Sequence, residues 1–419
     1  MAVSIVRELR ARRRASAWAA CAAAFLGGML AGLVTAPGGT PSARAGGAFQ
    51  PIKRLPAPAL RLADELPRWI APGGRLTVRG WAGAVRRVSL VVRGRRVATA
   101  RSGSLGRFEL TGRVGAAGKA LVEVTSEGRR LRAGRMLVRP VVLAAGGDVT
   151  PGAGGVVERE GEAYPWTGVG STMRRADLAT VNLEGVISSR GAPALKEYVF
   201  RGSPGLLRGA ARVAGIDFVS VANNHSLDYG REAFLDTLAA ARRVGIATVG
   251  GGATIDLARR PALLDVGGLK IAVLGFSDVR PLGFDAGPDW AGATPAFADL
   301  IAYDVAAARR RADIVVVWFH WGAELAEHPN GQQRVLAATA LRAGATVVLG
   351  AHPHVLQPVT REGRGLVAWS LGNLVFPSGR PQTRSTGVLL ASLDARGVRG
   401  FRLERATITG FRPAFDAAA

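Results

Sequence analysis

The sequence predicts a layered α/β domain with flanking helices, preceded by a small all-β sandwich of the immunoglobulin-like kind. Short β-type runs separated by Gly-rich turns fill residues 61–140, whereas from residue 141 apolar β runs alternate with helical ones. The length of 419 residues and the apolar content of 48% exclude a disordered chain and indicate more than one domain. The single cysteine, Cys21, excludes an intramolecular disulfide and a cysteine-based metal cluster.

The first 34 residues have the pattern of a targeting segment. Arginines precede an uncharged run over residues 16–34, which is long enough for a membrane helix. Because positive residues stay inside, we expect an anchor in the cytoplasmic membrane with the rest of the chain extracytoplasmic. A cleaved signal peptide is the alternative, since Ala43-Arg44-Ala45 has the form of a cleavage site and cleavage after Ala45 would release the chain. Residues 35–60, rich in Pro, Gly and Ala, are expected to form a linker.

The β module over residues 61–140 is strongly basic. Residues 51–140 hold 20 basic against five acidic residues, whereas residues 141–419 hold 29 against 25. The module therefore either has an arginine-coated solvent face or binds a polyanion, such as an acidic polymer or lipid headgroups. Because the chain is expected outside the cytoplasm, we expect no nucleic acid partner. The predicted strands are Leu76–Arg79, Val88–Val92, Val97–Ala100, Arg107–Leu110, Ala120–Thr125 and Gly134–Val138.

Residues 141–419 are predicted to form an α/β domain, because their β-type runs are more continuously apolar than strands with one solvent-exposed face. Continuous apolar runs are typical of strands buried on both faces. The predicted strands are Val141–Ala145, Leu178–Val181, Phe218–Ala222, Ala247–Val249, Ile271–Leu274, Ile314–Phe319, Thr346–Leu349 and Leu366–Trp369. The predicted helices are Arg231–Val244, Ala298–Arg311 and Gln332–Ala343, of which the first and last are stopped by Gly245 and Gly344.

Polar side chains follow five of these strands at the point where each strand ends. In open α/β sheets the carboxyl ends of the strands form the ligand crevice, so we expect these side chains to converge. Carboxylate oxygen and imidazole nitrogen together favour a divalent cation, and a shared carboxylate can bridge two ions. The sequence therefore predicts one or two divalent ions (Mn, Fe or Zn). The residues are Asp148, Glu184, Asn223, Asn224, His225, His320, His352 and His354.

Each of these residues has a structural alternative when it is taken singly. Asp148 and the two asparagines are common turn residues, and Glu184 could be a buried hydrogen-bonding residue. We interpret Asp228 as the cap of the following helix and His328 as an exposed loop residue. Glu324 lies within reach of the crevice, where it either supports the site or is only structural.

Seven motifs occur in order over about residues 141–377. They are Gly147-Asp148, Asn182-Leu183-Glu184-Gly185, Tyr198-x-Phe200-Arg201, Asn223-Asn224-His225-x-x-Asp228-x-Gly230, His320-Trp321-Gly322-x-Glu324, Gly350-x-His352-Pro353-His354-Val355-x-Gln357 and Ser370-Leu371-Gly372-Asn373. Together they resemble the bacterial capsule-synthesis family of the CapA/PgsA type, the poly-γ-glutamate synthesis proteins. The sandwich lies outside this resemblance.

The resemblance implies a domain similar to calcineurin-like metallophosphoesterases. By this likeness Glu184 would bridge the metal ions, and His225 would act as catalytic acid or transition-state donor. The sequence departs from that superfamily at Asp148-Val149-Thr150, where Asp-x-His is the rule, so one ligand is missing. The other implied ligands are Asp148, Asn224, His320, His352 and His354, and we expect Asn223, Asp228, Glu324, Arg201 and Asn373 to support them or to contact substrate.

Two functions fit these observations. The first is a metal-dependent hydrolase that cleaves a phosphoester, or an amide within an acidic polymer. The second is a non-catalytic anchored scaffold that holds or guides a polymer such as poly-γ-glutamate. In both, membrane-bound synthase subunits are expected as partners.

Overall fold

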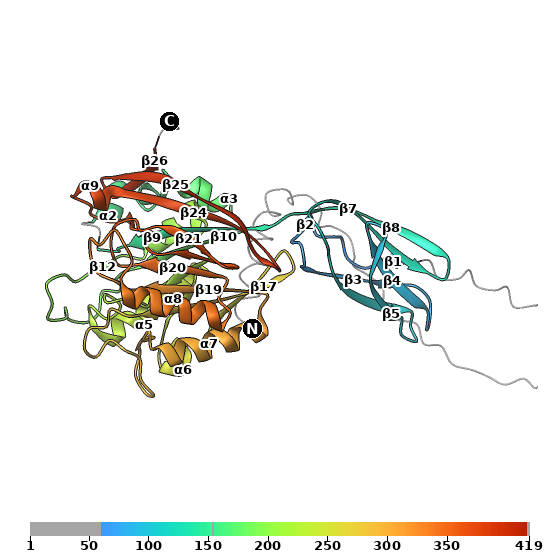
Figure 1. Ribbon diagram of the computed structural model, residues 1–419, viewed down its shortest axis with the longest axis horizontal. Helices are drawn as coiled ribbons and strands as arrows, with labels where there is room; N and C mark the ends of the chain where they lie inside the picture. The colour runs from blue at the N-terminus through green and yellow to red at the C-terminus, as the bar shows by residue number, and fades with distance from the viewer. Residues whose placement is uncertain (1–59, 153–154, 417–419) are drawn as a thin grey trace, which may run out of the picture.

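The computed structural model describes residues 60–152 and 155–416. The predicted anchor at 16–34, the cleavage site after Ala45 and all but the last residue of the predicted linker therefore lie outside the described residues. Within them the chain forms a β-sandwich followed by an α/β body, which run from blue to red in Figure 1. The described residues include no helix long and apolar enough to cross a membrane.

The amino-terminal module is a sandwich of two sheets, as predicted, and its strands pair antiparallel except for the short parallel pair β2–β8. Strand β3, with the sequence RLTVRGW, alternates exposed and buried residues because only one of its faces meets a core. A three-stranded sheet in the order β1-β3-β6 encloses that core with a five-stranded sheet in the order β2-β8-β7-β4-β5. The strands are β1 (Arg61–Leu62), β2 (Trp69–Ile70), β3 (Arg75–Trp81), β4 (Arg87–Val92), β5 (Arg95–Arg101), β6 (Arg107–Arg113), β7 (Gly118–Ser126) and β8 (Arg129–Val138).

The α/β body contains two facing sheets. The first has eight strands in the order β14-β13-β10-β9-β24-β25-β26, with β23 beside the end of β9. Every residue of β10 is buried, because this sheet has a packed layer on both faces. Its strands are β9 (Val141–Val149), β10 (Leu178–Leu183), β13 (Phe218–Ser220), β14 (Ala247–Val249), β23 (Asn373–Val375), β24 (Ser385–Asp394), β25 (Gly397–Thr409) and β26 (Arg412–Phe415).

The second sheet has six strands in the order β16-β17-β19-β20-β22-β21. Its central strands are parallel. The two sheets share one hydrophobic core, which includes Leu143 and Leu389 from the first sheet and Ile271 and Trp318 from the second. Its strands are β16 (Ala262–Val266), β17 (Leu269–Ser277), β19 (Ile314–His320), β20 (Val347–Ala351), β21 (Val359–Glu362) and β22 (Gly365–Ala368). Two further pairs of short strands are β11 (Val186–Ile187) with β12 (Arg201–Gly202) and β15 (Gly251–Gly252) with β18 (Gly292–Ala293).

Helices cover the outer faces of both sheets and complete the predicted layered α/β fold. The three predicted helices are α5, α7 and α8, and α8 begins at a capping box of Asn330 with Gln333 and ends at Gly344, which has a φ of 111°. Helices α7 and α8 pack on the second sheet, and α3, α4 and α5 pack on the first. The helices are α2 (Val156–Glu160), η1 (Tyr164–Trp166), α3 (Gly170–Arg175), α4 (Gly205–Gly209), η2 (Ala210–Ala214), α5 (Gly230–Arg243), α6 (Ile255–Ala258), α7 (Ala298–Arg311), α8 (Gly331–Ala343) and α9 (Pro381–Arg384).

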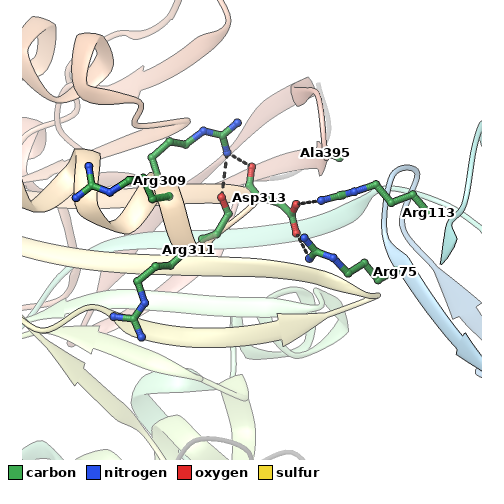
Figure 2. A pocket seen from close by; sticks show the side chains of 8 residues that line it. Arg75, Arg113, Arg309, Arg311, Asp313 and Ala395 are labelled. Carbon is green, nitrogen blue, oxygen red and sulfur yellow. Dashed lines mark hydrogen bonds and ion pairs between the residues drawn. The ribbon is translucent and has the colours of Figure 1, made fainter. Parts of the chain in front are cut away.

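The sandwich joins the α/β body at the amino ends of the body's strands. The backbone N–H groups of Ala71 and Arg75 donate to the carbonyls of Gly267 and Gly268 in the β16–β17 turn, each at 2.8 Å. Figure 2 shows the guanidinium groups of Arg75 and Arg113 converging on the carboxylate of Asp313, at 3.1 and 2.8 Å. Because the strands run away from this junction, their carboxyl ends lie at the opposite end of the body.

Candidate metal centre

The carboxyl ends of strands from both sheets meet at one end of the α/β body and bring the predicted ligands together. The sequence predicted the convergence but placed it at the edge of an open sheet, whereas the structure forms it between two sheets. The first sheet supplies Asp148 at the end of β9, Glu184 after β10, and Asn224 and His225 after β13; the second supplies His320 at the end of β19, and His352 and His354 after β20.

Glu184 lies at the centre of this cluster without a hydrogen-bond partner. Its side chain has no exposed surface, and neither carboxylate oxygen accepts a hydrogen bond from a described residue. Oε1 lies 3.6 Å from Nε2 of His320 and 3.9 Å from Nε2 of both His225 and His354. Burial and the nearby carboxylate of Asp148 raise the pKa of Glu184 well above its ordinary value. A buried carboxylate surrounded by imidazole nitrogens at these distances fits a position beside a cation.

Asp148 is fixed beside Glu184 by hydrogen bonds from both sheets. The Asn182 amide donates to Oδ1 at 2.8 Å, and the backbone N–H of His352 donates to Oδ2 at 3.1 Å. Asp148 follows Gly147, where a side chain would overlap the carbonyl oxygen of Gly372. The close approach of these two segments therefore requires glycine at position 147.

His320 is oriented by two asparagine amides. Its Nε2 lies 2.7 Å from Oδ1 of Asn224, and its Nδ1 lies 3.2 Å from the amide nitrogen of Asn182. Since an amide nitrogen can only donate, Nδ1 accepts and Nε2 carries the proton in this arrangement. Burial, and after it the neighbouring imidazoles of His352 and His354, lower the pKa of His320 well below its ordinary value, so this imidazole is neutral.

The two histidines after β20 differ in charge. Burial and the neighbouring His354 lower the pKa of His352 to about 4, and its buried Nδ1 has no partner among the described residues. Burial opposes the charged form of His354, but the carboxylates of Glu184 and Asp148 outweigh it and raise its pKa to about 10. Both residues adopt a positive φ, 95° and 58°, a backbone strain that is typical of functional sites.

The side-chain ligand atoms define two overlapping sites that share Glu184. Glu184, His320 and His352 form one group, and Asp148, Glu184 and His354 form the other, with the ligand atoms of each group within 4.8 Å of one another. Asn224 adds an oxygen to the first group through its contact with His320. Thr150, two residues after Asp148, is buried, and its hydroxyl accepts from the Gly152 amide at 3.2 Å.

His225 lies at the rim of the cluster and is held by a carboxylate. Its Nδ1 lies 2.7 Å from Oδ2 of Asp228, which also accepts from the Phe200 amide at 2.6 Å. The Phe200 ring stacks on the imidazole with centroids 4.1 Å apart. Burial lowers the pKa of His225, although Asp228 opposes the shift. The interpretation of Asp228 as a helix cap was wrong, because α5 begins after Tyr229 and has no side-chain cap, and the carboxylate turns inward to His225.

Two residues that support this arrangement were missed from the sequence. Lys196 donates to the Asn224 carbonyl at 2.6 Å and pairs with Oδ1 of Asp228 at 2.7 Å. Nothing in its loop signalled this role except that Lys196 is one of only four lysines in an arginine-rich chain. Asn182 could have been found, because it precedes Glu184 by two residues and therefore lies on the same face of β10.

The remaining predicted residues occupy different positions around the site. Asn373 accepts from Nδ1 of His354 at 2.8 Å, and Asn223 donates to the Leu183 carbonyl at 2.8 Å, so both hold the loops that carry ligands. Glu324 is exposed, but its carboxylate lies near His352 and His354. Arg201 donates to the Gly191 carbonyl at 3.1 Å and lies over the Tyr229 ring, so it holds its own loop, and His328 is exposed as predicted.

The α/β body is similar to known capsule synthesis proteins. The family model described as "Bacterial capsule synthesis protein PGA_cap" matches residues 142–378. The PGA biosynthesis protein CapA of Bacillus subtilis (strain 168) is 37% identical over 194 residues, which cover 46% of this chain and 51% of that protein. The capsule biosynthesis protein CapA of Bacillus anthracis is 28% identical over 249 residues, which cover 58% of this chain and 61% of that protein. The chain thus spans about half the length of the curated relatives it matches.

Among solved structures, the chain is similar to a 5'-nucleotidase precursor from Thermus thermophilus. The TM-score is 0.39 at 16% sequence identity, and the similarity covers 66% of this chain and 56% of that one.

Proposed function

Because this chain belongs to the bacterial capsule synthesis protein family, we propose that it acts in the synthesis or export of an anionic polymer such as poly-γ-glutamate. We propose further that it acts outside the cytoplasm, anchored to the membrane by residues 16–34, and that its buried cluster is a divalent-metal site of the hydrolase type. Membrane-bound synthase subunits are the partners that this role requires.

The surroundings of Glu184 support the metal site most strongly. A buried carboxylate without a hydrogen-bond donor is costly unless a cation compensates it. The residues around it fit a divalent ion. Asp148 supplies a carboxylate oxygen, and His320 and His352 supply imidazole nitrogens, all within 4.8 Å of the Glu184 carboxylate. When bound, the ion supplies the positive charge that polarises a phosphoryl or acyl oxygen and activates water.

His225 supplies the proton-transfer group in this proposal. The Nδ1–H of His225 donates a hydrogen bond to Asp228, which leaves Nε2 facing the cluster 3.9 Å from Glu184. The lowered pKa keeps His225 neutral at neutral pH, so Nε2 is free to accept a proton from water or a substrate group. Lys196 keeps the pair in place through Asp228.

The scaffold without catalysis is the second candidate, and the charge of the sandwich favours it. Exposed arginines lie on most strands of the sandwich, and Thr150 replaces one expected ligand of the site. In this role the sandwich would hold the polymer electrostatically, and binding would weaken as salt rises.

Metal content of the purified full chain tests the site. We expect one to two equivalents of Mn, Fe or Zn, and their loss in the double variant His352→Ala/His354→Ala, by elemental analysis. The matched control is His328→Ala, which removes an exposed imidazole and leaves the metal content unchanged. Absence of metal after reconstitution with all three ions would eliminate the hydrolase-type site.

His225→Ala separates the two candidate functions. If the chain is a hydrolase, cleavage of a phosphodiester probe or of poly-γ-glutamate falls about 10²–10⁴-fold while the metal stays bound. If the chain is a scaffold, poly-γ-glutamate binding is unchanged in His225→Ala. That binding is lost when Arg86, Arg87, Arg93, Arg95 and Arg96 are reversed in charge.

A further inference from the structure

The end of the sandwich far from the α/β body forms one compact surface, which we call the distal tip and define as residues 60–62, 81–87 and 101–107. Strand β3 begins at the junction with Arg75 and ends here with Trp81. The loops before β4 and before β6 are joined by backbone hydrogen bonds from Ala82 to Gly106 at 2.9 Å and from Val85 to Gly103 at 3.3 Å. Arg61 pairs with Trp81, so the described chain begins at this tip.

The distal tip exposes large apolar side chains. Leu105 is 81% exposed and Val85 is 57% exposed, on loops that face solvent together. A cavity of about 480 Å³ lies between Arg61, Trp81 and Leu105, and the Arg61 guanidinium lies 4.4 Å from the centre of the Trp81 ring. An exposed leucine beside an arginine-covered indole is typical of surfaces that enter the interface of a bilayer.

The distal tip also holds an uncompensated pair of arginines. Arg87 and Arg101 lie directly opposite each other on β4 and β5, so their side chains share one face. Neither has an ion-pair partner in the part of the chain that the structure describes. The sandwich contains the same arrangement at its other end, where Arg75 opposes Arg113, and there the carboxylate of Asp313 lies between them (Figure 2). The pair at the tip is therefore available to bind an anion of another molecule.

We propose that the distal tip lies on an anionic lipid surface, with Leu105 and Val85 in the interface and Arg87 and Arg101 on lipid phosphates. The proposal rests on the membrane anchoring proposed above, because the apolar run at 16–34 ends 26 positions before residue 60, the first residue of the tip. A bilayer accounts for both features of the tip, since apolar side chains insert and arginines pair with anionic headgroups. A soluble acidic polymer would account only for the arginines.

The geometry gives this contact a consequence for the metal centre. Strand β3 covers the distance from the tip to the junction with the body, and β17 covers the distance from the junction to the site. At about 3.3 Å per residue these two strands span roughly 50 Å. The tip on the membrane would hold the candidate metal centre at that distance from the lipid.

A fluorophore at the tip of the full-length chain tests the contact. The cysteine-free background Cys21→Ser receives Leu105→Cys, labelled with an environment-sensitive dye, and the chain is placed in nanodiscs of phosphatidylglycerol and phosphatidylcholine that contain nitroxide-labelled lipid. We expect a blue shift and quenching at position 105 in anionic nanodiscs. The control is Leu282→Cys, which labels a residue that is 103% exposed on the α/β body and shows neither change.

Charge variants identify the groups that make the contact. Arg87→Glu/Arg101→Glu should remove the quenching at position 105, whereas Arg95→Glu/Arg96→Glu, the same change in charge at the other end of β5, should retain it. An unquenched dye at position 105 in chains that are embedded in anionic nanodiscs would overturn the proposal while leaving the anchor intact. A chain that does not enter nanodiscs at all would overturn both. A dye that responds to poly-γ-glutamate but not to lipid would assign the tip to the polymer instead.

Discussion

At the scale of single residues, the site contains more buried negative charge than the positive charge around it neutralises. Glu184 and Asp148 place two carboxylates in a fully buried cluster, and only His354 among its imidazoles has a raised pKa. Away from the site, a buried carboxylate has a close ion-pair partner, as Asp304 has in Arg259 at 2.7 Å. The contrast indicates that the imbalance at Glu184 is a binding feature rather than a general property of the core.

Glu184→Gln should stabilise the metal-free protein and abolish its response to metal. Removing a buried charge that His354 compensates only in part should raise the free energy of unfolding in EDTA by about 1 kcal/mol or more. Added Mn or Zn should stabilise the wild type by mass action and leave the variant unchanged. Urea unfolding with and without metal measures both effects, with Glu160→Gln, a change at an exposed glutamate outside the cluster, as control. A variant that is less stable than wild type in EDTA would show that Glu184 is already compensated.

Lys196→Met should destabilise the protein by about 3–5 kcal/mol, because it leaves the buried carboxylate of Asp228 without its cation. Lys196→Arg should recover part of this loss, since it restores the charge but not the compact ammonium that reaches Asn224 and Asp228 together. Thermal or urea unfolding gives the comparison, and the exposed Lys119→Met should change little. Equal stability of Lys196→Met and Lys119→Met would contradict the structural role of Lys196.

At the scale of elements, β9 organises the site. It is the central strand of the first sheet, with β10 on one side and β24 on the other, and it carries Asp148 to the meeting point of both sheets. Near its end β9 also contacts the segment before β23, through the hydrogen bond from the Asp148 amide to Gly372 at 2.9 Å. The position of Asp148 therefore depends on how closely β9 and that segment can approach.

Gly147→Ala should displace Asp148, because the added methyl group overlaps the Gly372 carbonyl and backbone must shift. We expect a loss of about 1–3 kcal/mol in stability from overpacking and a weaker metal affinity in titrations of the chelator-treated protein. Gly115→Ala is the matched control, since a side chain there meets no atom within 4 Å. Unchanged metal affinity in Gly147→Ala would show that the site tolerates movement of β9.

The elements that the sequence predicted are those with a strong local pattern. Runs such as Ile314–His320, buried at every residue, and the capped helix α8 are recognisable without tertiary contacts. Strands β24, β25 and β26 were not predicted. Strand β25 mixes exposed arginines with apolar residues and is a strand only through its pairing with β24, whereas β24 was missed although most of its residues are apolar and buried. The ligands were predictable since each follows a strand, whereas Lys196 lies in a loop and reaches the site only through the fold.

At the scale of the whole molecule, two carboxylates, Asp313 and Asp177, link the sandwich to the α/β body. Asp313 begins the segment that enters β19, and it accepts from Arg75, Arg113 and the backbone N–H of Lys270 at 3.0 Å. A second contact joins Arg139 to Asp177 at 2.6 Å, and the Arg139 guanidinium lies over the Trp69 ring. Polar contacts of this kind make the junction sensitive to pH and salt.

Asp313→Asn should loosen the junction at neutral pH, and acid should do the same to the wild type. Burial alone would raise the pKa of Asp313, but the Lys270 amide and the Arg113 guanidinium outweigh it and hold that pKa below its ordinary value. A lowered pKa in the folded state stabilises the junction above about pH 4, and this contribution is lost as pH falls through the folded value. Solution scattering from pH 6 to pH 3 should show an increase in the radius of gyration. A wild-type profile that matches Asp313→Asn at every pH would contradict the prediction.

The hydrogen bond between the His352 amide and Asp148 has a consequence for maturation, because it joins positions 204 residues apart. A ribosome that adds about 5–20 residues per second makes the last ligands roughly 10–40 s after the first. Until then the cluster lacks the loop that carries His352 and His354, which supplies one imidazole to each of the two groups around Glu184. At the proposed metal site, loading would therefore come late, and the compartment in which the chain finishes folding would decide which ion it meets.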